Sequence, residues 1–198
     1  INIIVNTIST LGYFGIFFLM ISESMLFPLP SEIIMTFSGF LISTGKLNFF
    51  LVVLYGTIGN TIGASAAFYV GHHFKHRVIE RFILKYGKFL FITKEEFERS
   101  EHIFQKHGAW VITLSRMAPG IRSIISIPAG ASHMPFKSFV VFSFIGSFLW
   151  CVMLAFLGTM LGSNWQSVKV IFHKFDLIII ISFIMVLGVY FYKKFRKN

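Results

Sequence analysis

Long apolar runs separated by short polar breaks dominate this chain. Two of them, Phe49–Val70 and Phe139–Leu161, contain no charged side chain, and about 20 apolar residues are enough for a helix to cross a membrane. Leu177–Tyr192 is a shorter run of the same kind. Ile3–Ile21 is also apolar, but polar residues interrupt its first half, so it could span the membrane or lie partly in the interface. The pattern predicts an all-α integral membrane protein.

One apolar segment carries charges and prolines that a simple membrane-spanning helix would not contain. Residues 107–135 hold Arg116 and Arg122 together with Pro119 and Pro128. An arginine at the centre of a membrane helix costs roughly 2.5 to 3.5 kcal/mol on insertion scales. Proline removes backbone hydrogen bonds that lipid cannot replace, so protein or a water-filled cavity must surround the break. The segment is therefore predicted to be a functional site.

The basic residues predict on which side of the membrane the loops lie. Residues 71–107 hold eight of the 18 Lys and Arg side chains and are expected to form amphipathic pieces in the cytoplasm. The same rule places the basic C-terminus in the cytoplasm. Two spans lie between these flanks, so the Arg116 segment must enter and leave the membrane on one side. It is predicted to be a re-entrant hairpin.

The segment from Glu23 to Glu32 has the same character, because charges and prolines interrupt its apolar pattern. It is expected to be re-entrant from the outer face. Matching positions recur 87 residues apart in one set and 91 in another: Phe49 with Phe136, Gly59 with Gly146 and Gly71 with Gly158, then Pro28 with Pro119 and Gly39 with Gly130. The predicted fold is an inverted repeat with two opposed re-entrant helical hairpins plus transmembrane helices. In such folds the broken elements meet near mid-membrane and commonly form a transport site.

The whole chain, residues 1–198, is interpreted as a single membrane domain. Its expected parts are a first inverted half, a cytoplasmic amphipathic segment, a second inverted half, and a final transmembrane helix with a basic tail: residues 1–71, 72–107, 108–162 and 163–198. Only 13% of residues are charged and the mean hydropathy is +0.75, whereas soluble domains are about a quarter charged. No signal peptide is expected, because the N-terminal apolar run lacks a basic leader.

The net charge of +10 is expected to face anionic lipid and to set topology, not to bind nucleic acid. No cofactor, metal or catalytic residue is predicted, since no HExxH, GxSxG or P-loop pattern occurs. His72, His73 and His76 are interpreted as a basic interfacial cap, because no carboxylate or cysteine accompanies them at ligand spacing. Cys151 is expected to pack, and Asn60 to form a hydrogen bond between helices.

Arg116 and Arg122 are the candidate substrate ligands. A guanidinium group presents a planar fork of donors that suits a pair of phosphate oxygens, and low-dielectric surroundings strengthen that contact. The alternative is that both arginines only pair with Glu23 and Glu32 to hold the hairpins together. The two carboxylates are also candidate proton carriers, because intramembrane carboxylates commonly form proton relays. For Glu32, which follows Ser31, a role at a helix start is the alternative.

The run RMAPGIRSIISIPAGASHMPF resembles the signature of the DedA family of bacterial membrane proteins, which share their core domain with eukaryotic lipid scramblases of the endoplasmic reticulum. The earlier run ESMLFPLPSE resembles the family's first conserved loop, with an acidic residue on each side of a Pro-x-Pro turn. The likeness covers roughly Glu23 to Gly158. The run HHFKHR after Gly71 departs from the family's pattern, so no function is carried over to that loop.

The resemblance implies two oppositely oriented re-entrant hairpins that face each other, and a role in moving lipids across or within the cytoplasmic membrane. Members are tied to recycling of the polyprenyl phosphate carrier of cell-wall synthesis, to phosphatidylethanolamine translocation and to the proton-motive force. By motif match, Arg116 and Arg122 correspond to the family's essential arginines. Glu23 and Glu32 correspond to its essential acidic positions.

The sequence thus predicts a lipid translocase of the bacterial cytoplasmic membrane, coupled to protons through the two carboxylates, with undecaprenyl phosphate as first substrate. The predicted headgroup site comprises Arg116, Arg122, Pro119, Gly120 and Gly130. Phosphatidylethanolamine is the nearest rival substrate. A lipid-phosphate phosphatase and a membrane-organising protein without transport activity are the alternatives from other classes, and a homo-oligomer is left open.

Overall fold

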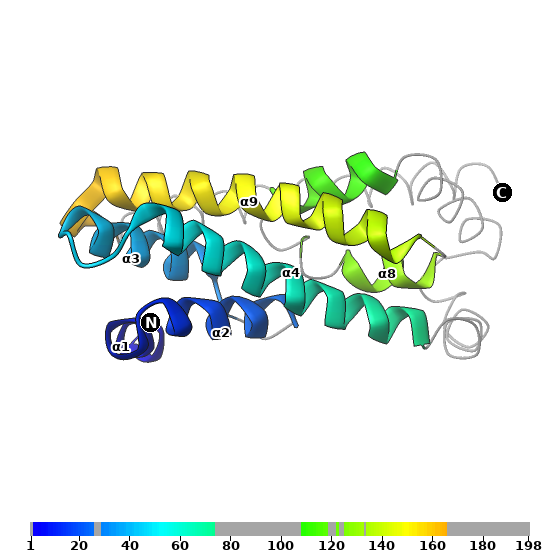
Figure 1. Cartoon of the computed structure of the whole chain (residues 1–198), viewed down its shortest axis with the longest axis horizontal. Coiled ribbons are helices and arrows are strands. Elements are labelled where there is room, and N and C mark those ends of the chain that lie inside the picture. Colours follow the sequence, from blue (N-terminus) through cyan, green and yellow to red (C-terminus); the bar gives the residue numbers. More distant parts are fainter. Residues whose placement is uncertain are drawn as a thin grey trace, which may run out of the picture.

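The computed structural model describes residues 2–25, 29–73, 108–118, 122, 125–132 and 134–165. Within these ranges the labelled helices of Figure 1 are α1 Asn2–Leu11, α2 Tyr13–Ser24, α3 Ser31–Ser43, α4 Phe49–His73, α8 Ser126–Ala131 and α9 Phe136–Leu161, followed by the 3₁₀ turn Gly162–Asn164. Residues 108–116 form a further helix. The described part of the chain contains no strand, which confirms the prediction of an all-α protein for these residues.

Two of the described helices are long and apolar enough to cross a membrane, α4 and the stretch Phe136–Asn164. The prediction of two uncharged spans is therefore confirmed. Helix α4 begins where the side-chain oxygen of Asn48 accepts hydrogen bonds from the backbone nitrogens of Phe50 and Leu51, at 2.9 and 3.4 Å. Helix α9 begins after Pro135. Proline is tolerated at the start of a helix but breaks a helix interior, so it marks where α9 starts.

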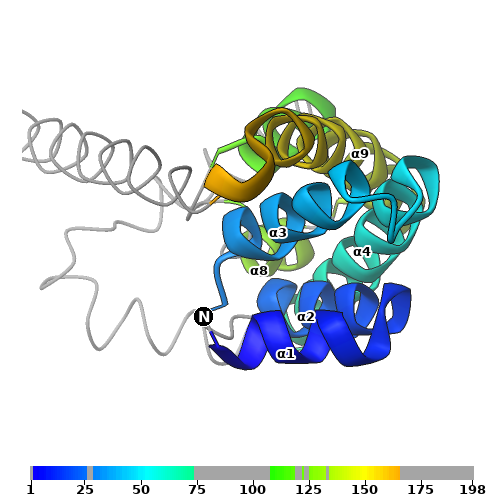
Figure 2. The same ribbon diagram turned by 90° about the vertical axis from the view of Figure 1, so that its left-hand side faces the viewer.

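The N-terminal apolar run is divided into two helices at Gly12. This glycine has a φ of 56°. Residues with a Cβ rarely adopt a positive φ, whereas glycine does so readily. Helices α1 and α2 have 10 and 12 residues, and at about 1.5 Å per residue neither alone covers the roughly 30 Å hydrocarbon core. Ile4 and Ile8 of α1 are buried, so α1 is held by packing against α2 and α3 (Figure 2).

The short helices form two pairs that lie at opposite ends of the molecule. In Figure 1, α2 and α3 occupy the left half, and α8 with helix 108–116 the right half, beside the long helices α4 and α9. Helix α2 packs on α4, and α3 on α9, while α8 packs on α4. Helix 108–116 meets α9 at Gly146, where an added Cβ would come within 2.7 Å of the Thr113 carbonyl oxygen.

Glycines allow the short helices to approach the long helices closely. A side chain at Gly39 of α3 would collide with the α9 backbone at Gly158, and a side chain at Gly130 of α8 would collide with the α4 backbone at Phe68. Gly39 and Gly130 are a matched pair of the internal repeat. Each lies on a short helix that packs on the long helix of the other half, which is the relationship an inverted repeat predicts.

Several predicted features lie outside the described residues. These are Pro28, Pro119, Gly120, His76, the amphipathic segment beyond His73, and the final span Leu177–Tyr192. The re-entrant character of the two hairpins stays a prediction.

Candidate functional site

A buried ion pair joins the two segments predicted to be hairpins. Arg122 Nη2 lies 2.8 Å from Glu23 Oε1, and the two side chains are only 3% and 6% exposed. Glu23 belongs to the last turn of α2, whereas Arg122 precedes α8. Such a pair gains little net stability because both charges lose their hydration, but loss of one partner leaves the other charge buried and uncompensated. The ion pair is therefore a strong constraint on how these two segments meet.

Two residues from other helices complete the surroundings of Arg122. Its Nη2 also donates a hydrogen bond to Ser31 Oγ at the start of α3, and Trp150 Nε1 of α9 donates to the same oxygen at 3.5 Å. The guanidinium carbon lies 5.5 Å from the centre of the Trp150 ring, within the range of a cation–π contact. Among the described residues, Nη1 of Arg122 has no hydrogen-bond partner.

The second carboxylate oxygen of Glu23 accepts a hydrogen bond from α4. Asn60 Nδ2 and Ser24 Oγ both donate to Glu23 Oε2 at 3.3 Å. Ser147 Oγ of α9 in turn donates to Asn60 Oδ1 at 2.7 Å. This confirms the prediction that Asn60 forms a hydrogen bond between helices, and it shows two such bonds, one to α2 and one to α9.

Arg116 lies at the end of helix 108–116 and is 1% exposed. Its Nη2 donates to Ser126 Oγ of α8 at 2.7 Å, and its guanidinium carbon lies 5.7 Å from the centre of the Phe139 ring. Within the described part of the chain, Nε and Nη1 of Arg116 have no hydrogen-bond partner. Buried polar atoms are nearly always paired. These two nitrogens are therefore suited to donate hydrogen bonds to the oxygens of an anion.

The structure brings together some of the predicted site residues. Arg122 pairs with Glu23, and Arg116 contacts Ser126 of α8, the helix that begins four residues after Arg122. Glu32 lies half-buried in the first turn of α3, beside Ser31. Gly130 serves the contact of α8 with α4.

Sequence reasoning missed the serines and the tryptophan of this centre. Ser147 lies 87 residues after Asn60, and Arg122 lies 91 residues after Ser31, the two spacings of the internal repeat. Applying these spacings to polar residues, and not only to glycine, proline and phenylalanine, would have singled out both pairs. Trp150 carries no such signal, because aromatic residues are common throughout this chain.

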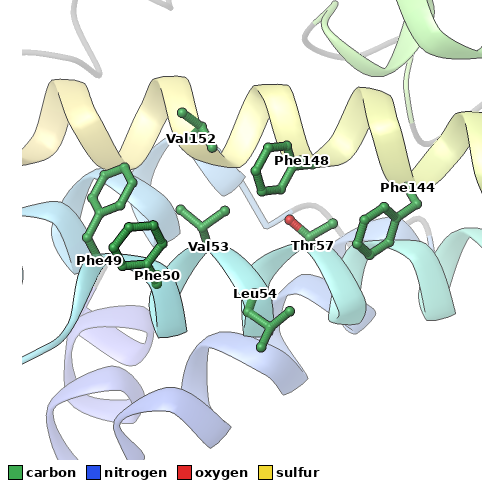
Figure 3. Close-up of a pocket in the computed structure, with 8 residues that line it drawn as sticks. All are labelled: Phe49, Phe50, Val53, Leu54, Thr57, Phe144, Phe148 and Val152. Carbon is green, nitrogen blue, oxygen red and sulfur yellow. The ribbon is translucent and has the colours of Figure 1, made fainter.

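An apolar groove runs between α4 and α9 close to the charged centre. Its volume is about 480 Å³, and Figure 3 shows the side chains that line it: Phe49, Phe50, Val53, Leu54, Thr57, Phe144, Phe148 and Val152. Thr57 lies nearly one turn before Asn60 on α4, and Phe148 follows Ser147 on α9. The groove therefore lies beside the Asn60–Ser147 hydrogen bond that joins the two helices, with Phe144 and Phe148 on either side of Ser147 along α9.

The fold and this centre define a helical membrane protein with a buried, positively charged polar site. Residues 29–160 match the VTT domain, and the chain belongs to this family, in agreement with the DedA resemblance of its motifs. Undecaprenyl phosphate transporter A of Bacillus subtilis is 35% identical over 99% of this chain and 95% of its own length.

Of two further relatives, one carries the same name and one a different name. Undecaprenyl phosphate transporter A of Staphylococcus aureus is 31% identical over 93% of this chain and 91% of its own length. An alkaline phosphatase-like protein of Lactococcus lactis subsp. cremoris is 34% identical over 98% of this chain and 92% of its own length. No solved structure matches the chain.

Proposed function

We propose that this protein is a lipid translocase that moves a phosphate headgroup past the two paired hairpins while the hydrocarbon chain stays in the bilayer. The observation that carries the proposal is the set of buried guanidinium nitrogens without partners among the described residues, two on Arg116 and one on Arg122. Charge-assisted hydrogen bonds from such donors to phosphate are short and strong, and water does not compete with them in a dry site.

Undecaprenyl phosphate is the substrate we propose first. Arg116, Arg122 and Glu23 are all buried, and these three side chains together carry one excess positive charge. An anionic headgroup balances this excess, whereas a zwitterionic headgroup adds an amine that must also be accommodated. The names of the two transporter A relatives support the same substrate. Phosphatidylethanolamine is the rival, with Glu23 or Glu32 as partner for its amine.

Glu23 would act as the competitor of the phosphate. In the described state it occupies one side of Arg122. Protonation of Glu23 would remove its charge and free Arg122 for the headgroup, and loss of that proton would favour release. Glu32, at the start of α3, is the second proposed proton carrier. This exchange would couple lipid movement to protons, as the intramembrane position of the carboxylates suggests.

A liposome translocation assay tests the proposal. Purified protein is reconstituted, and the appearance of undecaprenyl phosphate or phosphatidylethanolamine in the opposite leaflet is followed with and without a proton gradient. We expect faster movement of undecaprenyl phosphate with the wild type, stimulation by the gradient, and loss of both with Arg122→Ala. Equal rates for wild type and Arg122→Ala at matched reconstitution would contradict the proposal.

The phosphatase-like names of the Lactococcus relatives make hydrolysis a second candidate. The same liposomes decide it, since release of inorganic phosphate from undecaprenyl phosphate can be measured in parallel. We expect transfer of intact lipid without phosphate release above that of protein-free liposomes. Release that depends on Arg116 would favour the phosphatase.

A further inference from the structure

Asn60 and Ser147 connect the long helices to the ion pair but are not themselves ionisable. The Ser147 hydroxyl donates to Asn60 Oδ1 at 2.7 Å, so the opposite side of the amide, Nδ2, faces Glu23 Oε2 at 3.3 Å. Both residues are almost fully buried, at 2% exposure each. Because Ser147 fixes which side of the Asn60 amide faces Glu23, the orientation of the carboxylate depends on a hydroxyl two helices away.

The Asn60–Ser147 hydrogen bond lies at a point along α4 and α9 where it can hold the two helices together. The groove of Figure 3 lies beside this bond, with Thr57 nearly one turn before Asn60 on α4 and with Phe144 and Phe148 on either side of Ser147 along α9. Side chains across an open groove lose part of their mutual dispersion attraction. The Asn60–Ser147 bond thus holds α4 to α9 at a point where apolar packing is interrupted.

We propose that Asn60 and Ser147 are positioning residues, which hold Glu23 against Arg122 and thereby set how readily a phosphate-bearing lipid captures Arg122. This inference rests on the proposed function, because it assigns a purpose to the competition between carboxylate and phosphate. When the two residues are intact, Glu23 occupies Arg122 until the headgroup displaces it, and returns to expel the headgroup. When either is removed, Glu23 is held less well, so the lipid should bind more tightly and leave more slowly.

The transport arm of the test compares Ser147→Ala and Asn60→Ala with the wild type over a range of undecaprenyl phosphate densities. We expect the half-saturating density and the maximal rate both to fall. The decrease should be about threefold to tenfold for Ser147→Ala, the range expected for loss of one hydrogen bond, and at least as large for Asn60→Ala, which loses two. Ser38→Ala is the matched control, since its buried hydroxyl donates only to the Ile34 carbonyl of its own helix. Ser147→Thr keeps the hydroxyl and should restore both quantities.

The spectroscopic arm needs no lipid substrate, because Trp150 lies against Arg122 and reports its position. With Trp110 and Trp165 replaced by Phe, the emission of Trp150 is recorded for each variant. We expect Ser147→Ala to move the emission maximum toward that of an Arg122→Gln reference. The Ser38→Ala control and the Ser147→Thr rescue should keep the wild-type emission.

The outcomes separate this inference from the proposed function. If the wild type moves neither lipid but Ser147→Ala shifts the Trp150 emission, the proposed function fails while the positioning of the ion pair stands. If the wild type transports lipid and Ser147→Ala lowers only the maximal rate, with unchanged half-saturation and emission, the two residues are merely structural and the inference is overturned. Should the two-Phe background not fold, the half-saturation of the variants in the native sequence still decides.

Discussion

Glu23 and Arg122 lie 99 residues apart in the chain, yet their side chains form an ion pair of 2.8 Å in the interior. Each comes from a segment in which charges and prolines interrupt an apolar run. Neither segment could bury its charge alone at an acceptable cost. The burial of each charge therefore depends on the two segments together.

The first prediction concerns the stability of this pair. Glu23→Ala leaves Arg122 buried opposite an empty position, and we expect a loss of about 3 to 5 kcal/mol in the free energy of unfolding. The double variant Glu23→Ala/Arg122→Met removes both charges and should recover most of that loss. Thermal unfolding in detergent measures both. A loss below about 1 kcal/mol for the single variant, as for an exposed pair, would show that the two charges are solvated.

The second prediction concerns Arg116, whose replacement should not destabilise the protein, in contrast to Glu23→Ala. Its side chain is fully buried, and two of its nitrogens lack hydrogen-bond partners among the described residues. Replacing it with methionine, which has a similar length, should keep or raise the unfolding temperature while abolishing lipid transport. Arg116→Lys retains the charge but loses the planar fork, so we expect reduced transport. A large loss of stability in Arg116→Met would assign Arg116 a structural role instead of ligand binding.

The glycine contacts give a third prediction, on packing. Gly39→Ala and Gly130→Ala each place a methyl group against the backbone of a long helix, and overpacking of this kind costs about 1 to 3 kcal/mol. Gly108→Ala is the matched control, since among the described residues the atoms nearest to its added methyl belong to the flexible Met134 side chain, at 3.3 Å or more. Unfolding temperatures compare the three. Equal values would mean that the short helices do not approach the long helices so closely.

The sequence predicted the two long apolar helices well, for a physical reason. Lipid requires long uninterrupted apolar runs, so α4 and α9 follow directly from residues 49–70 and 139–161. Placing a charged side chain in lipid is also costly in free energy. Glu23, Arg116 and Arg122 were therefore recognisable in the sequence as unusual residues within apolar segments. The Gly12 break could not be predicted, because glycine is frequent within membrane helices and only the φ angle distinguishes a break.

The hydroxyl groups of the site were harder to predict. Many serines and threonines among the described residues donate to a carbonyl three or four residues earlier in the chain, as Ser38 does to Ile34. The sequence does not distinguish these residues from the serines of the site. Ser31, Ser126 and Ser147 are exceptions because the helix opposite brings a polar group within reach. Their roles depend on tertiary contacts, which no local pattern contains.

The last prediction concerns membrane topology. Lys46 and His73 lie exposed at opposite ends of α4, a helix of 25 residues that is long enough to cross the bilayer. With Cys151 replaced by serine, we expect Lys46→Cys to react with a membrane-impermeant maleimide in intact cells, and His73→Cys only after permeabilisation. Asn198→Cys should behave like His73→Cys, because a re-entrant Arg116 segment leaves the C-terminus in the cytoplasm. Labelling of Asn198→Cys in intact cells would mean that the Arg116 segment crosses the membrane fully, and the inverted repeat would have to be abandoned.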